Sequence, residues 1–163
     1  MLDQKKLGLN CFAWIVFFVL SNGMTVAEAK FLPLNPAGLI EAKTKPCTLV
    51  HAWAVWCSLC VQEMPELVKF FNENPQIKPV VVDVSGISAQ NDFTKKWKIL
   101  KSAKFDLFLK PSGDDDAYMA AIDAKWSGTL PYSALYHKGK KIKEWEGVSP
   151  TQEWAKTFPA LCK

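Results

Sequence analysis

The stretch "HAWAVWCSLCVQEMPEL", His51 to Leu67, joins an apolar run to an amphipathic segment through two cysteines, Cys57 and Cys60. Residues 47–54, CTLVHAWA, form a nearly continuous apolar run of strand length, which predicts a strand buried on both faces. From residue 61 to residue 74 apolar side chains recur every three or four positions, which predicts a helix with one apolar face. The two cysteines therefore lie where a buried strand meets a helix, the edge at which α/β sheets place ligands and chemistry.

The rest of the sequence predicts further strands and helices around this unit. The expected elements are a helical turn or two near residues 36–42, strands at 78–86 and 105–109, helices at 88–101 and 117–126, a hairpin at 131–147 and a last helix from Ser149 with Pro150 at its first position. Strand–helix alternation followed by a hairpin and a helix predicts an α/β domain, with a mixed central sheet covered by helices on both faces.

Composition restricts the function further. The chain has 163 residues, enough for one domain with a proper core, and shows no internal repeat or linker. The formal net charge is +4, but the lysines are scattered along the chain. Scattered lysines are typical of a solvated basic face, so no nucleic-acid partner is expected. An anionic partner or a membrane surface stays open.

The N-terminal residues 1–29 have the pattern of a secretory signal peptide. Lys5 and Lys6 precede an apolar stretch at residues 9–20, which is short for a membrane span. A small-x-small motif, the usual cleavage signal, ends at Ala29. We therefore expect cleavage after Ala29, a domain over 30–163, and export to the periplasm; an uncleaved membrane anchor is the alternative. Disulfides persist in such an oxidising compartment.

Two cysteines separated by two residues can bind a metal, form a structural bridge or exchange electrons. A zinc site needs four ligands, yet there is no second such pair, and His51 and His137 are far apart in sequence. A bridge within so short a loop constrains little chain entropy. A helix N-terminus stabilises a thiolate through its dipole and unpaired N–H groups. We therefore expect Cys57 to be a nucleophile and Cys60 to resolve the mixed disulfide, with no metal or cofactor. Copper binding stays open.

The cysteine motif also carries a family resemblance. The pattern F-W-A-x-W-C-x-x-C-x-x-E-x-P-x-L is typical of exported TlpA/ResA-like thiol–disulfide oxidoreductases of the thioredoxin superfamily. It is matched at Trp53, Ala54, Trp56, Cys57, Cys60, Glu63, Pro65 and Leu67. The chain resembles this group over essentially all of residues 30–163.

The resemblance implies a thioredoxin-like fold and an enzyme that cycles a Cys57–Cys60 redox-active disulfide. It implies reduction of protein disulfides, in a process such as cytochrome c biogenesis, with a membrane electron-donor or electron-acceptor protein as partner. An exported thioredoxin-like copper metallochaperone using the same two cysteines is the alternative. The direction of electron flow stays open, because comparable pairs span roughly −270 to −120 mV.

Several supporting residues follow from the resemblance. Pro131 matches a proline that is cis and faces the cysteine pair, and Leu130 would offer its backbone to a substrate chain. Leu130 and Tyr132 depart from the residues common in this group, which bears on substrate fit. Trp53 and Trp56 are expected to shield the cysteine pair from water.

Two titratable residues have alternative interpretations. His51 replaces the buried aspartate of thioredoxins or the asparagine frequent in TlpA-like proteins. It is either a proton relay to Cys60 or a buried neutral histidine held by one hydrogen bond. Glu63, one helical turn after Cys60, either tunes the pKa values of the cysteines and contacts substrate, as in the family, or is a solvent-facing helix residue.

The two remaining cysteines of the expected mature chain are Cys47 and Cys162. Cys47 begins the central strand at the end opposite Cys57, and the last helix is expected to return to that same end. We therefore expect a structural Cys47–Cys162 disulfide.

Overall fold

The computed structural model describes residues 29–86, 98–148 and 151–162. Three predictions lie mainly outside the described residues: the signal peptide, the helix at 88–101 and the start of the last helix at Ser149 and Pro150. Of the helix at 88–101, the structure describes only a short 3₁₀ helix, η2, over Lys98–Ser102.

A six-stranded sheet organises the domain, with strand order β1-β4-β3-β2-β5-β6. The strands are β1 (Phe31–Pro33), β2 (Thr48–Trp53), β3 (Lys78–Asp83), β4 (Leu107–Leu109), β5 (Tyr132–His137) and β6 (Lys140–Glu146). Strand β2 pairs in parallel with β3 and antiparallel with β5, so the predicted mixed sheet is confirmed. The short strand β1 was not predicted; it pairs in parallel with β4 at the edge of the sheet.

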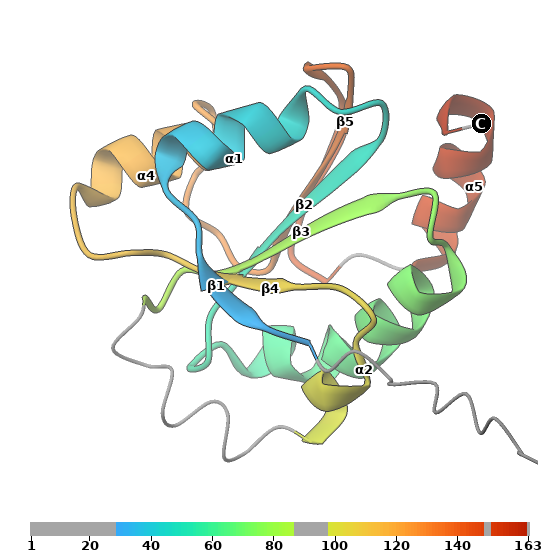
Figure 1. Ribbon diagram of the computed structural model, residues 1–163, viewed down its shortest axis with the longest axis horizontal. Coiled ribbons are helices and arrows are strands. Elements are labelled where there is room, and N and C mark those ends of the chain that lie inside the picture. Colours follow the sequence, from blue (N-terminus) through green and yellow to red (C-terminus); the bar gives the residue numbers. More distant parts are fainter. Residues whose placement is uncertain (1–28, 87–97, 149–150, 163) are drawn as a thin grey trace, which may run out of the picture.

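Helices cover both faces of the sheet, as predicted (Figure 1). They are α1 (Pro36–Lys43), α2 (Ser58–Glu73), α4 (Asp115–Ile122) and α5 (Thr151–Leu161). Helices α1 and α4 lie together on one face, while α2 and α5 lie on the other (Figure 1).

Strand β2 separates two hydrophobic cores because its side chains alternate between the faces. Leu49 and Trp53 belong to the core beneath α2 and α5. Val50 and Ala52 belong to the core beneath α1 and α4. All residues of β2 are buried, which is the pattern expected of a central strand. This strand therefore carries His51 into the interior, and the loop after it carries Cys57 to the sheet edge.

Helix α2 begins three residues earlier than the apolar periodicity indicated, at Ser58 rather than Val61. Cys57 is its N-cap residue, and the Cys57 Sγ accepts a hydrogen bond from the backbone N–H of Cys60 at 3.2 Å. A cysteine is not among the preferred cap residues, so this position carries no ordinary helix-start signal in the sequence. The cap places Cys57 against the N–H groups of the first helical turn.

Candidate active site

Cys57 and Cys60 lie at disulfide distance at the start of α2. Their Sγ atoms are 2.16 Å apart and their Cα atoms 5.3 Å apart. Cys57 retains 9 % of its surface, whereas Cys60 is fully buried. An incoming group therefore meets Cys57 first, which agrees with the roles of nucleophile and resolving cysteine that the sequence predicts.

The Leu130–Pro131 segment lies at the same edge of the sheet as the cysteine pair. Its peptide bond is cis, the geometry that the family resemblance implies. Tyr132 pairs with Ala52 across the β5–β2 ladder, so the two residues before Tyr132 lie beside the end of β2. Leu130 also lines a cavity of about 220 Å³ together with Trp56, which directly precedes Cys57. Segments far apart in the sequence thus meet around the cysteine pair.

The two tryptophans near the pair differ in exposure. Trp53 is buried in the core beneath α2. Trp56 is 71 % exposed, so most of its side chain faces solvent. That Trp56 shields the cysteine pair from water stays a prediction. An exposed indole next to Cys57 in sequence is an apolar surface of the kind that binding partners contact.

His51 is fully buried between the sheet and the helices α2 and α5. Its Nδ1 lies 2.9 Å from the Oγ of Ser133, its direct cross-strand partner on β5. Its Nε2 lies 3.2 Å from the Oε1 of Glu63 on α2. Because burial penalises the charged imidazolium, the pKa of His51 is lowered to about 3. The imidazole is therefore neutral near neutral pH. This favours the interpretation of His51 as a buried neutral histidine held by a hydrogen bond.

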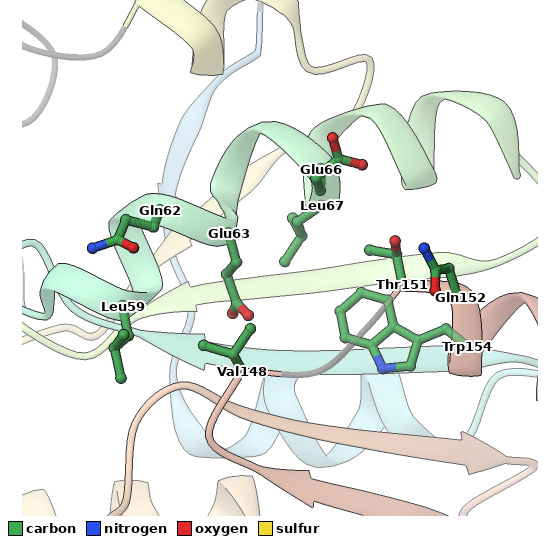
Figure 2. A pocket seen from close by; sticks show the side chains of 9 residues that line it. All are labelled: Leu59, Gln62, Glu63, Glu66, Leu67, Val148, Thr151, Gln152 and Trp154. Carbon is green, nitrogen blue, oxygen red and sulfur yellow. The ribbon is translucent and has the colours of Figure 1, made fainter.

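Glu63 points inward, and the interpretation as a solvent-facing helix residue is wrong. Its side chain keeps only 9 % of its surface and reaches His51. On its other side Glu63 lines a cavity of about 470 Å³ between α2 and α5 (Figure 2). The other lining residues are Leu59, Gln62, Glu66, Leu67, Val148, Thr151, Gln152 and Trp154. One of these lining residues, Leu59, lies between the two cysteines in sequence.

Sequence reasoning missed two polar residues near this edge. Ser133 was not singled out, because its contact with His51 depends on the β2–β5 register. Asp83 ends β3 and is 1 % exposed; its Oδ1 accepts a hydrogen bond from the backbone N–H of Ser85 at 2.8 Å. Burial raises the pKa of Asp83 above its usual value. For Asp83, the available signal in the sequence was an acidic residue at the end of an apolar strand.

The remaining cysteines are bridged at the opposite end of β2. The structure joins Cys47 to Cys162 by a disulfide, with the Cα atoms 5.5 Å apart and a sequence separation of 115. Cys47 directly precedes β2, and Cys162 directly follows α5. The bridge thus ties the C-terminal helix to the central strand.

Within residues 29–86, 98–148 and 151–162, no group of three or more His, Cys, Asp and Glu side chains is arranged to hold a metal ion. Over the same ranges no helix combines the length and apolar composition needed to cross a membrane.

No protein-family model matches the sequence, and no curated protein is significantly similar to it. Solved structures do match. They include the exposed lipoprotein thioredoxin Etrx1 of Streptococcus pneumoniae, with 21 % identity over 83 % of this chain and 100 % of that chain, at a TM-score of 0.53. StoA of Bacillus subtilis has 22 % identity over 69 % of this chain and 82 % of that chain, at a TM-score of 0.51. The dsbF protein of MTB has 20 % identity over 72 % of this chain and 81 % of that chain, at a TM-score of 0.55.

These similarities define the class of fold. The match covers most of this chain, so the shared feature is the arrangement of sheet and helices. The chain has the thioredoxin fold, which confirms the fold that the sequence predicts.

Proposed function

We propose that the protein is an exported thiol–disulfide oxidoreductase of the TlpA/ResA-like kind, working through Cys57 and Cys60. The observation that carries the proposal is the position of this pair. The two sulfurs lie at disulfide distance at the N-terminus of α2, where Cys57 keeps 9 % of its surface exposed and Cys60 keeps none. A helix N-terminus favours the thiolate form of the capping cysteine, and the thiolate is the nucleophile in disulfide exchange.

The reaction moves two electrons from the dithiol to a substrate disulfide. The Cys57 thiolate attacks one substrate sulfur, forming a mixed disulfide and releasing the other substrate sulfur as a thiolate. The Cys60 thiol loses its proton and attacks the Cys57 sulfur. The Cys57–Cys60 disulfide forms, the second substrate thiolate leaves, and both substrate thiolates take up protons. A dithiol donor must then reduce the Cys57–Cys60 bond.

The substrate in this proposal is a protein disulfide. Trp56 and Leu130, which line one cavity, would contact the substrate chain. The family resemblance implies that the backbone before the cis Pro131 faces the cysteine pair. Cytochrome c biogenesis is the process that the family resemblance favours, with a membrane electron-donor protein to reduce the pair. Support for export comes from the signal pattern of residues 1–29 and from the description of Etrx1 as an exposed lipoprotein. Residues 30–163 would form the mature domain.

A turnover assay tests the proposal. The purified protein, supplied with a small dithiol, is expected to reduce insulin disulfides, and Cys57→Ser is expected to abolish the reaction. A parallel titration with Cu(I) addresses the metallochaperone alternative. Tight binding of Cu(I) by the wild type, with no disulfide exchange, would overturn the proposal in favour of copper transport.

A further inference from the structure

Asp123, the residue that caps the C-terminal end of α4, joins three segments of the chain through one carboxylate. It is only 8 % exposed. Its Oδ2 accepts hydrogen bonds from the Tyr132 hydroxyl on β5, at 2.6 Å, and from Lys141 Nζ on β6, at 2.5 Å. Its Oδ1 accepts a hydrogen bond from the backbone N–H of Lys125 at 3.0 Å. Both carboxylate oxygens are therefore satisfied, as a buried charge requires.

The bond between Tyr132 and Asp123 joins a hydroxyl to an ionised carboxylate. Burial alone would raise the pKa of Asp123, but the hydrogen bonds from Lys141 and Tyr132 outweigh this effect, and the pKa lies below its usual value. Burial raises the pKa of Tyr132, so its hydroxyl keeps its proton and donates it. Such charge-assisted hydrogen bonds are shorter and stronger than those between neutral groups. The pair is therefore a firm connection between α4 and β5.

Tyr132 directly follows Pro131 in sequence, yet it is only 1 % exposed, so a substrate cannot reach its side chain. Its ring instead stacks on the ring of Trp126, with the centroids 5.0 Å apart and the planes inclined by 28°. The Trp126 Nε1–H in turn donates a hydrogen bond to the backbone carbonyl of Thr129 at 2.8 Å. The unusual residue at position 132 can therefore affect substrate fit only through its neighbours.

These contacts extend to the segment that approaches the cysteine pair. The backbone N–H of Trp126 donates to the carbonyl of Asp123 at 3.0 Å, so the segment is held where it leaves α4. The indole of Trp126 holds it again at Thr129. The next residue, Leu130, lines the cavity of about 220 Å³ together with Trp126 and Trp56. A continuous series of contacts thus runs from the buried carboxylate to a residue beside Trp56.

We propose that Asp123, Tyr132 and Trp126 are positioning residues for the binding of a polypeptide substrate. They hold the main chain at Leu130 in the place where the substrate chain meets it as it reacts with Cys57. This inference rests on the proposed function and adds the origin of substrate affinity. A segment that already has its bound conformation loses little freedom on binding. If the segment is loosened, fewer molecules are competent to bind, and the KM rises while the exchange chemistry stays the same.

The chain offers a matched pair of variants, Tyr132→Phe and Tyr136→Phe. The Tyr136 hydroxyl also binds the end of α4, donating to the carbonyl of Ile122 at 3.1 Å, and Tyr136 is 5 % exposed. Each variant therefore removes one buried hydroxyl bond from β5 to α4, but the Tyr132 ring alone of the two stacks on Trp126. In the insulin assay Tyr132→Phe is expected to raise the KM about fivefold with kcat nearly unchanged. Tyr136→Phe is expected to keep the KM of the wild type.

The indole N–H of Trp126 reports on the segment without any substrate. Its hydrogen bond to Thr129 protects it from exchange with solvent deuterium, and its NMR signal is assigned by its loss in Trp126→Phe. Exchange of this N–H is expected to be faster in Tyr132→Phe than in the wild type, and unchanged in Tyr136→Phe. Trp126→Phe keeps an aromatic ring but removes the donor to Thr129, so it is also expected to raise the KM for insulin with little change in kcat.

Two results would overturn the inference. Equal KM values in Tyr132→Phe and Tyr136→Phe would show that the hydroxyl bonds serve stability alone. An exchange rate of the Trp126 indole in Tyr132→Phe equal to that of the wild type would show that Tyr132 does not hold the segment. Failure of the proposed function is read separately, from the absence of Cys57-dependent insulin reduction in the wild type; the indole measurement does not depend on that reaction.

Discussion

The Cys57 sulfur accepts a hydrogen bond from the backbone N–H of Cys60, so the residue that we propose as the nucleophile also caps its own helix. Capping normally requires a serine, threonine, aspartate or asparagine oxygen. Here a sulfur takes that position and faces the first-turn N–H groups, which favour negative charge. The same local geometry that starts the helix is the one that, in the proposed function, favours the thiolate of Cys57.

Stability at acidic pH tests the state of His51. Its pKa in the folded protein, about 3, is below the usual value of 6.5, so the unfolded chain binds more protons between these two pH values. The free energy of unfolding is therefore expected to fall as the pH is lowered from about 6.5 toward 3, by on the order of a few kcal/mol. Urea unfolding over this range measures the effect.

The control for this slope is His51→Gln, which cannot titrate. Its free energy of unfolding is expected to change less over the same pH range. Identical pH slopes in the variant and the wild type would show that His51 does not control acid sensitivity.

The Cys47–Cys162 bridge is expected to support stability without taking part in exchange. The double variant Cys47→Ser/Cys162→Ser is expected to lose about 2–4 kcal/mol of unfolding free energy, because the bridge closes a long loop. Chemical denaturation measures the loss, and the insulin assay is expected to show an unchanged rate. A double variant as stable as the wild type would rule out the structural role.

Trp56 is expected to contribute to substrate binding. Its exposed ring lies beside Cys57 and shares a cavity wall with Leu130. Trp56→Ala is expected to raise the KM for a protein disulfide roughly tenfold, the cost of losing one large interface side chain. A small disulfide, which cannot span both residues, is expected to be reduced at an unchanged rate. A similar loss with both substrates would place Trp56 in the exchange chemistry instead.

The sequence predicted the parts of the fold that depend on local pattern. The continuous apolar run of β2 and the hairpin of β5 and β6 are both present, and the hairpin turns at Lys138 and Gly139, which have positive φ values of 50° and 84°. Strand β1 was missed because three residues carry no periodicity; the strand exists through its pairing with β4.

The site was predictable to the extent that it lies in one motif. The positions of the cysteines follow from a strand end and a helix start. The contact between His51 and Ser133 does not, because it depends on the register between strands 82 residues apart in sequence. The burial of Glu63 likewise depends on how α5 packs against α2, which the periodicity of either helix alone does not determine.

The central claim is that Cys57 attacks and Cys60 resolves, and trapping the mixed disulfide tests it most directly. Cys60→Ser is incubated with a protein disulfide substrate and analysed by mass spectrometry after digestion. We predict a covalent adduct linked through Cys57, with none in Cys57→Ser and only transient amounts in the wild type. An adduct linked through Cys60 in Cys57→Ser, or no adduct in Cys60→Ser, would contradict this account.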